Sequence, residues 1–240
     1  MNKEGLADYL DSLKKYGIPG CGCVIFQDHK PVFRHTAGYA DAEGTKPVTQ
    51  TNTYWLYSAS KVITCTAVMQ LIEKGSIRLD APVSDYLPEY KSMKVKKGSG
   101  VERARNTMTI RHLLSMQSGL NYDLQSPSIL KALKDTDGQA DTRQIIRALA
   151  DEPLDFEPGT HFQYSLSHDV LGAVIEEVSG MRFGVYLDEH IFKPLGMKNT
   201  GFELTPERKA NMAAQYEYNP DTKISVPISL KNCYALSANY

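Results

Sequence analysis

A serine and a lysine three positions apart offer the clearest chemistry in this sequence. They lie in Ser58-Ala59-Ser60-Lys61, just before a long apolar segment that we predict to be a helix. A serine hydroxyl is a poor nucleophile at neutral pH, and a lysine three residues later on a helix lies on the same face, close enough to take its proton. The spacing therefore predicts a serine nucleophile with a lysine base.

The same S-x-x-K pattern occurs twice more, so the neighbouring residues must indicate which copy is catalytic. Ser12 to Lys15 lies in a segment with helical spacing of apolar residues that leaves the serine on the polar side, which indicates an exposed surface helix. Ser128 to Lys131 lies in a polar stretch, where Ser128 is expected to cap the short segment Ile129 to Leu133. Only Ser58 precedes a helix whose apolar residues surround most of its circumference, which indicates burial.

Burial at the start of a helix would also favour the charge states that catalysis requires at Ser58 and Lys61. Low dielectric favours a neutral, basic amine at Lys61, and the positive end of the helix favours negative charge on the oxygen of Ser58. The four residues by themselves leave an alternative open, in which Ser58 only caps the helix and Lys61 extends to water.

Composition gives no sign of a nucleic-acid or membrane partner. The 240 residues include 27 basic and 28 acidic side chains, for a formal charge of −1. The one basic cluster, Lys91 to Arg105, contains two glycines and is expected to be a solvated loop. The N-terminus has no apolar leader and no stretch approaches the length of a membrane span, so we expect a cytoplasmic protein.

The sequence also contains no pattern for a metal or a cofactor. The four cysteines form no C-x-x-C pair, and the six histidines have no metal-ligand spacing. There is no H-E-x-x-H, no phosphate-binding G-x-x-x-x-G-K-[ST] and no G-x-S-x-G. We expect no bound metal, no cofactor and reduced thiols at Cys21, Cys23, Cys65 and Cys233.

Strand patterns flank a mainly helical middle. Runs 20–26 and 31–39 are expected to pair as an antiparallel hairpin, and runs 213–218 and 223–228 as a weaker one. Glycines that can terminate helices follow several of the predicted helical segments. Those segments are 59–74, 109–117, 142–150, 167–179 and 182–192.

Five ordered blocks carry a family resemblance that spans residues 17–202. They read GYADAEGTKPVTQTNTYWLYSASK, QLIEKGSIRLDAPVSDYLPEY, TIRHLLSMQSGL, FEPGTHFQYSLSHDVLGAVIEEVSG and IFKPLGMKNTGF. The chain resembles the serine β-lactamase-related superfamily, which includes class C β-lactamases, D,D-peptidases, family VIII esterases and acyltransferases.

The resemblance implies an α/β fold of the α+β type, with an antiparallel sheet flanked by helices and a mainly helical region. It implies a single catalytic domain over 1–240, in which 1–57 holds the N-terminal helix and hairpin, 58–204 the helical region, and 205–240 a partial return towards the sheet.

The resemblance also implies roles for three residues. Ser58 would be acylated by an ester or amide, and Lys61 would be its base. The second family motif falls on Tyr164, in Gln163-Tyr164-Ser165-Leu166. With 14 tyrosines in the chain, any one of them is more often a packing residue, but Tyr164 directly precedes a predicted helix and could pass protons beside a cationic lysine.

Three further positions are expected at the substrate. Leu166 stands where β-lactamases of this group usually carry an asparagine that orients an amide, and this favours esters over β-lactams. Ser118 and Asn121 flank a segment that resembles the border of the family's pocket, although a plain helix stop explains that segment equally well. Asp169, in the first turn of the next helix, is expected to be structural.

The family's third motif, a K-T-G, H-x-G or W-x-G triplet, has no counterpart after Tyr164. His35-Thr36-Ala37-Gly38 resembles it only superficially, because it lies on a strand before Ser58. The chain is therefore expected to be truncated, and the loss of one oxyanion donor would cost about 3 kcal/mol in the transition state. Three alternatives follow for the open edge of the hairpin: a complementing C-terminal fragment covers it, a second copy pairs with it, or the chain is a partial gene product of weak stability.

Two functional classes follow. The first is a serine hydrolase, most simply a carboxylesterase on small esters, with a β-lactamase or D,D-peptidase as the nearer alternative. The second is a non-catalytic remnant that keeps the fold.

Overall fold

The computed structural model describes residues 2–228, which form two compact units. Residues 2–55 and 204–228 make up one, the hairpin unit, and Leu56–Glu203 make up the other, the helical unit. These limits fall close to the predicted ones at 57/58 and 204/205. That both belong to a single catalytic domain stays a prediction.

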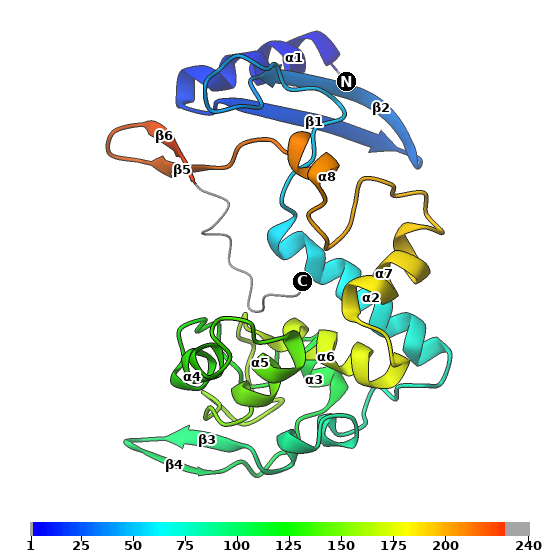
Figure 1. The fold of residues 1–240 in the computed structure, drawn as a ribbon, viewed down its shortest axis with the longest axis vertical. Helices are drawn as coiled ribbons and strands as arrows, with labels where there is room; N and C mark the ends of the chain where they lie inside the picture. The colour runs from blue at the N-terminus through cyan, green and yellow to red at the C-terminus, as the bar shows by residue number, and fades with distance from the viewer. Residues whose placement is uncertain (1, 229–240) are drawn as a thin grey trace. The chain divides into compact units, whose positions relative to one another are not determined.

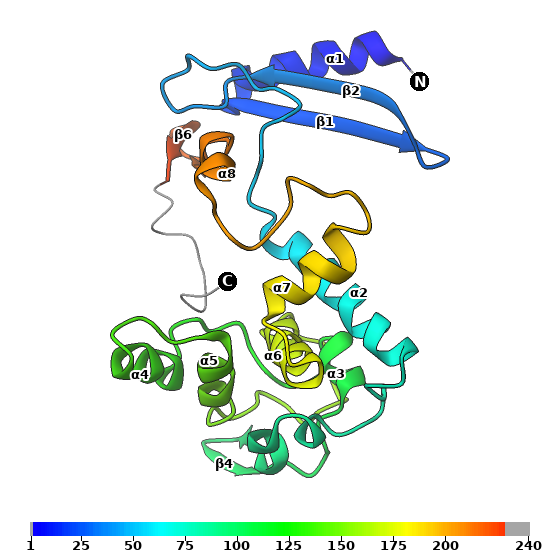
Figure 2. The same cartoon turned by 45° about the vertical axis from the view of Figure 1, so that its right-hand side comes forward.

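The hairpin unit begins with a helix and an antiparallel pair of strands. Helix α1 (Lys3–Ser12) is capped by Asn2, whose side chain accepts a hydrogen bond from the amide of Gly5. Strands β1 (Gly20–Gln27) and β2 (Lys30–Gly38) pair in antiparallel register, and α1 packs against β2 (Figure 2). The predicted first hairpin is confirmed.

The chain returns to this unit after residue 203. Helix α8 (Pro206–Ala210) leads to strands β5 (Tyr216–Asn219) and β6 (Ile224–Pro227), which confirms the second hairpin in a shorter form. The returning segment is fixed by backbone bonds, because the amide of Thr53 donates to the carbonyl of Asn211 and the amide of Ala213 donates to that of Thr53. Residues 229–240, the end of the predicted return towards the sheet, lie outside the described residues, and this range includes Cys233.

Part of the apolar surface of the first hairpin is open, as expected. The side chains of Val24 and Phe26 are 42% and 58% exposed, and Val32 is half-buried. What covers this surface in solution, whether a second copy or another segment, stays a prediction.

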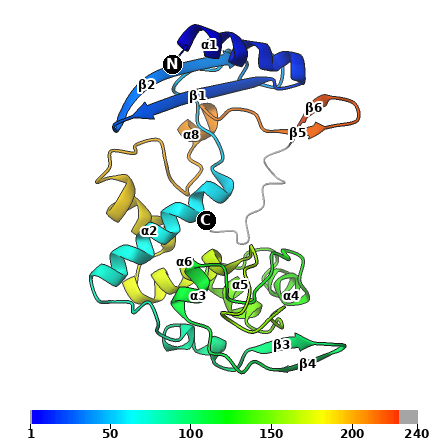
Figure 3. The ribbon, with the colours of Figure 1, turned by 180° about the vertical axis from the view of Figure 1, so that it is seen from behind.

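The helical unit is organised around α6 (Ser167–Ser179). Helices α2 (Ser60–Glu73), α3 (Ile110–Leu114), α5 (Thr142–Leu149) and α7 (Phe183–Leu187) all pack against it (Figures 1 and 3). The apolar run 170–175 of α6 is buried, and Gly180 ends the helix in the left-handed conformation. The unit is completed by α4 (Pro127–Asp135), a π-helical turn (Asp188–Phe192) and 3-10 turns at Val83–Asp85 and Pro88–Ser92.

Three local expectations were wrong. Helix α2 is not buried all round: its face with Ala67 and Val68 lies in the core, whereas Val62 is 71% exposed because packing partners in the helical unit lie on one side. Ser128 does not cap a helix, because α4 begins one residue earlier with Pro127, whose fixed φ suits the first helical position. Its backbone amide instead donates to the carboxylate of Glu152.

The third correction concerns the basic cluster 91–105, which is not a loop. It contains strands β3 (Lys94–Lys97) and β4 (Gly100–Arg103), paired as an antiparallel hairpin. The backbone of β3 is anchored by Leu154, which accepts from the amide of Lys96 and donates to the carbonyl of Lys94.

Within residues 2–228, no helix combines the length and apolarity needed to cross a membrane. The same residues contain no group of three or more side chains arranged to hold a metal ion. Cys21, Cys23 and Cys65 are free thiols.

The central position of α6 predicts where the chain is most sensitive to truncation of a side chain. Leu171 is fully buried on α6, so Leu171→Ala is expected to lower the free energy of unfolding by about 2 to 5 kcal/mol. Leu195→Ala removes the same atoms from a side chain that is 70% exposed and should cost less than about 1 kcal/mol. Urea denaturation followed by circular dichroism measures both, and equal losses would contradict the assignment of α6 as the core helix.

Candidate active site

The structure brings Ser58 and Tyr164 into direct contact. The phenolic oxygen of Tyr164 donates a hydrogen bond of 2.5 Å to Oγ of Ser58, across 106 positions of sequence. Ser58 lies just before α2 and Tyr164 just before α6, so the packing of these two helices sets the contact. Both side chains are exposed, which leaves the serine accessible to a substrate.

Ser58 is presented by a tight turn and not by the helix itself. It is the central residue of a 3-10 turn, Tyr57–Ala59, and α2 begins only at Ser60. Tyr57 has a φ of +44°, a left-handed conformation that costs a non-glycine residue on the order of 1 to 3 kcal/mol and is common at functional sites. The hydroxyl of Ser60 donates to the carbonyl of Tyr57 and helps to hold this turn.

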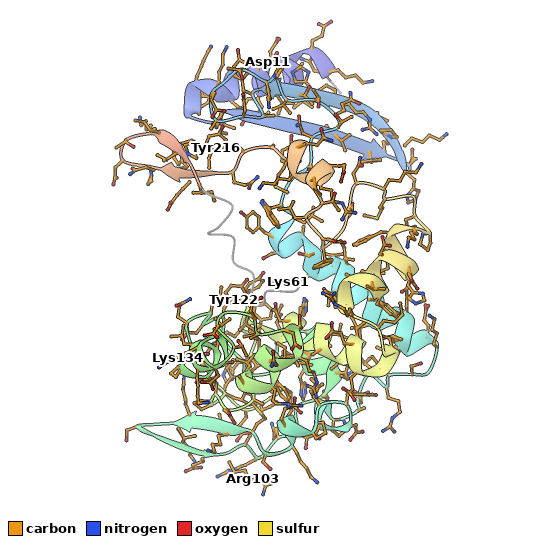
Figure 4. All side chains as sticks on the ribbon, in the orientation of Figure 1. Asp11, Lys61, Arg103, Tyr122, Lys134 and Tyr216 are labelled. Carbon is orange, nitrogen blue, oxygen red and sulfur yellow. The ribbon has the colours of Figure 1, made fainter. Side chains whose placement is uncertain are left out.

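Lys61, in the first turn of α2, lies close to two aromatic rings that also contact each other. Its Nζ is 5.0 Å from the ring centroid of Tyr164 and 5.3 Å from that of Tyr122, and the two rings are themselves 5.3 Å apart. Figure 4 labels Lys61 and Tyr122. A cation over an aromatic face is stabilised by about 0.5 to 2 kcal/mol. Sequence reasoning missed Tyr122, although it directly follows Asn121, which was expected at the pocket.

The charge state of Lys61 differs from the sequence expectation. Burial lowers its pKa, as expected, but the interactions with the Tyr164 hydroxyl and the Asp169 carboxylate outweigh burial and leave the pKa raised. Lys61 is therefore an ammonium group at neutral pH, and not the neutral amine that burial alone predicted. Asp169 acts on the site through this charge.

The same ammonium group acidifies Tyr164. Burial raises the pKa of the phenol, but the hydrogen bond with Ser58 and the neighbouring Lys61 lower it more, so that the pKa lies below its ordinary value. The group hydrogen-bonded to the serine is thus a phenol that ionises more readily than a free tyrosine.

Ser118 and Leu166 lie in the interior. Ser118 is fully buried, and its hydroxyl is 2.8 Å from that of Ser167 and accepts from the amide of Leu120. Leu166 is 1% exposed, and its amide donates to the carbonyl of Asn121. These bonds hold the two segments that carry Tyr122 and Tyr164 together. A direct contact of Ser118 or Leu166 with substrate would require these segments to move, and it stays a prediction, as does a contact by half-buried Asn121.

Gly119 is required by the geometry of this segment. Its φ is +86°, and a Cβ added there would lie 2.2 Å from the carbonyl oxygen of Phe156. The carbonyl of Gly119 also accepts from the amide of Asp155 at 2.8 Å. A side chain at this position would therefore displace the segment that carries Tyr122.

His168, on α6, contacts both α3 and α2. One ring nitrogen is 3.3 Å from the carbonyl of Leu114, and the ring is 3.6 Å from the thiol of Cys65. Burial lowers the pKa of His168, so the ring is neutral near pH 7 and adds no second cation beside Lys61.

A sequence profile of the β-lactamase family matches residues 6–235. The chain belongs to the β-lactamase family. It is 35% identical over 222 residues to esterase EstB of Burkholderia gladioli, an alignment that covers 88% of this chain and 55% of EstB.

Solved structures of other proteins share the fold of this β-lactamase-family chain. EstCE1, described as a hydrolase with promiscuous acyltransferase activity, matches 94% of the chain and 58% of its own with a TM-score of 0.79 and 32% identity. Simvastatin synthase (LovD) from Aspergillus terreus matches 95% of the chain and 62% of its own with a TM-score of 0.77 and 25% identity. The chain thus spans little more than half the length of these relatives, and the α/β fold expected from sequence is confirmed.

The packing around Gly119 yields a test with an internal control. Gly119→Ala and Gly180→Ala both place a side chain at a left-handed position, which costs about 1 to 2 kcal/mol, but a Cβ at Gly180 meets nothing within 4 Å. Gly119→Ala is expected to destabilise the fold by at least about 2 kcal/mol more than Gly180→Ala, because its Cβ also collides with backbone. Thermal melts of both variants measure the difference, and similar losses would show that the segment yields without strain.

Proposed function

We propose that the chain is a serine hydrolase that cleaves small carboxylic esters through an acyl-enzyme intermediate on Ser58. The observation that carries the proposal is the 2.5 Å contact between Ser58 and a phenol whose pKa is lowered by Lys61. A nucleophile in hydrogen-bond contact with a base that a third group tunes is the arrangement that covalent catalysis requires. The family assignment and the similarity to EstB support the same chemistry.

In the acylation step, ionised Tyr164 takes the proton from Ser58, and Oγ attacks the carbonyl carbon of the ester. As the tetrahedral intermediate collapses, Tyr164 returns the proton to the departing alkoxide. The backbone amide of Ser58 and the N-terminal end of α2 favour negative charge on the carbonyl oxygen. Lys61 stays protonated and stabilises the phenolate throughout.

Deacylation repeats the sequence with water in place of the serine. Tyr164 takes a proton from water, the hydroxide attacks the acyl carbon, and the proton passes to Oγ of Ser58 as the acid leaves. One residue therefore acts as base and acid in both half-reactions.

Two observations favour esters over β-lactams and peptides. Leu166 occupies the position where an amide-orienting asparagine is usual in the family's β-lactamases, and its apolar side chain is buried. EstB is described as an esterase and EstCE1 as a hydrolase. A panel of chromogenic esters beside a chromogenic cephalosporin tests this preference, since faster opening of the cephalosporin would reverse it.

A fluorophosphonate probe tests the proposal as a whole. It reacts with activated serines, so peptide mapping should find the label on Ser58. Folded chain that stays unlabelled would identify a non-catalytic remnant.

Replacing the nucleophile gives the first kinetic prediction. Ser58→Ala should lower ester hydrolysis at least about a thousandfold, because it removes the proposed nucleophile. Ser12→Ala and Ser128→Ala, which remove the serines of the other two S-x-x-K copies, should leave the rate unchanged. Initial rates with a chromogenic ester measure all three, and turnover retained in Ser58→Ala would remove Ser58 from the mechanism.

The pH dependence of the acylation rate gives the second kinetic prediction. If ionised Tyr164 is the base, the acylation rate should rise with pH through the phenol's pKa, which lies below its ordinary value of 10.0. Lys61→Met removes the charge that lowers this pKa, so the midpoint should move to higher pH and the rate at pH 7 should fall. Lys61→Arg keeps the charge and should keep the midpoint near that of the wild type.

Single-turnover kinetics between pH 6 and pH 10.5 separates these cases. Tyr164→Phe should slow both acylation and deacylation and remove the pH dependence assigned to the phenol. A midpoint that is the same in the wild type and in Lys61→Met would show that Lys61 does not tune Tyr164.

A further inference from the structure

The hairpin β3–β4 carries a concentration of positive charge that the proposed reaction does not use. Residues 91–105 contain six basic residues and one acidic residue, while the whole chain has a net charge of −1. The strands are exposed apart from Val95, which is buried. Arg103 lies at the outer edge of the helical unit (Figure 4).

The register of the hairpin places two cations directly opposite each other. Lys94 pairs with Arg103, and Lys96 on the same face pairs with Val101. Like charges at opposite positions of an antiparallel pair repel. Lys96 is neutralised by Asp155 at 2.7 Å, but among the described residues neither Lys94 nor Arg103 has a carboxylate within 4.0 Å.

An open depression of about 280 Å³ lies beside this pair. It is lined by Ser92, Lys94, Val101, Glu102 and Arg103. The one acid in it, Glu102, is already paired with Lys97 at 2.8 Å, which holds the pKa of Glu102 below its ordinary value. The depression therefore offers the hydroxyl of Ser92 and two cations, Lys94 and Arg103, that no carboxylate of the described residues neutralises.

We propose that this face of the hairpin docks on an anionic lipid surface, with a headgroup phosphate held between Lys94 and Arg103. The charge complementarity is direct, since each basic residue near such a surface raises partitioning roughly fivefold. Val101, 52% exposed on the same face, supplies an apolar contact at the headgroup boundary. The contact is peripheral and independent of the chemistry at Ser58.

A lipid surface fits the hairpin better than a nucleic acid does. Proteins that bind single strands combine positive charge with aromatic rings on which bases stack, and the segment 94–103 has no aromatic residue. Lysine predominates in it, and lysine interacts with phosphate as a hydrated point charge without the fixed geometry of base recognition.

Vesicle sedimentation tests the proposal with the purified chain. Vesicles of phosphatidylcholine with one third phosphatidylglycerol should bind the chain, and vesicles of pure phosphatidylcholine should not. Binding should fall steeply as salt is raised, because exposed charges are screened. The double variant Lys94→Gln/Arg103→Gln should bind roughly 30-fold more weakly, from two cations at about fivefold each.

The matched control is Lys134→Gln/Arg147→Gln, which removes the same two residue types from exposed positions on α4 and α5. It should bind as the wild type does. Loss of a repulsive pair should leave the hairpin variant at least as stable as the wild type, and a thermal melt verifies this. Equal weakening in both variants would show that only overall charge matters and would overturn the site.

Two other outcomes would also overturn the proposal. One is an equal affinity for vesicles with and without phosphatidylglycerol. The other is tight binding to a uridine-rich single-stranded RNA by a chain that does not sediment with either vesicle, which would assign the patch to nucleic acid.

Discussion

The candidate site depends on one hydrogen bond, between Tyr164 and Ser58, which the packing of α2 against α6 makes possible. This bond joins two residues 106 positions apart and requires the segments before α2 and α6 to meet. A buried chain of serine hydroxyls, from Ser118 through Ser167 to Ser165, fixes the segment after Tyr164. Because an unpaired hydroxyl in a dry interior is costly, these hydrogen-bonded hydroxyls favour a single arrangement of the segment and therefore of Tyr164.

The electrostatics of the site follow from that arrangement. Lys61 lies close to the rings of Tyr122 and Tyr164, whose aromatic faces stabilise a cation. Burial lowers the pKa of Lys61, but the Tyr164 hydroxyl and the Asp169 carboxylate raise it more, and Lys61 in turn lowers the pKa of Tyr164. The site thus places a protonated amine, Lys61, beside an easily ionised phenol, Tyr164. Tyr164 is therefore the better base for the serine.

Sequence reasoning succeeded where the signal is local. The bounds of α6 were predicted residue for residue, because the segment contains an apolar run and a glycine directly follows its last residue. The hairpin β1–β2 follows from two β-rich runs and a short polar connection. The choice of Ser58 over Ser12 and Ser128 rested on its neighbours, and the structure places it beside Tyr164.

It failed where distant parts of the chain decide. The ionisation of Lys61 depends on Tyr164 and Asp169, more than 100 positions away, and burial alone gives the opposite sign. The left-handed Tyr57 has no sequence signal, since non-glycine residues rarely adopt that conformation. The basic cluster 91–105, with its two glycines, was expected to be a loop, but Val95 of β3 is buried and Leu154 bonds the backbone on either side of it.

The basic hairpin and the candidate site meet at one carboxylate. Asp155 accepts hydrogen bonds from Lys96 on β3, from Gln163 next to Tyr164, and, at 3.5 Å, from Asn121 next to Tyr122. Burial raises the pKa of Asp155, but the bonds from Lys96 and Gln163 lower it more, so the pKa lies below its ordinary value. A depressed carboxylate pKa means that the junction is held by charge at neutral pH and weakens only as the pH falls through that pKa. The two tyrosines next to Lys61 are therefore each one residue from a side chain bonded to Asp155, and the same carboxylate anchors the hairpin whose outer face carries Lys94 and Arg103.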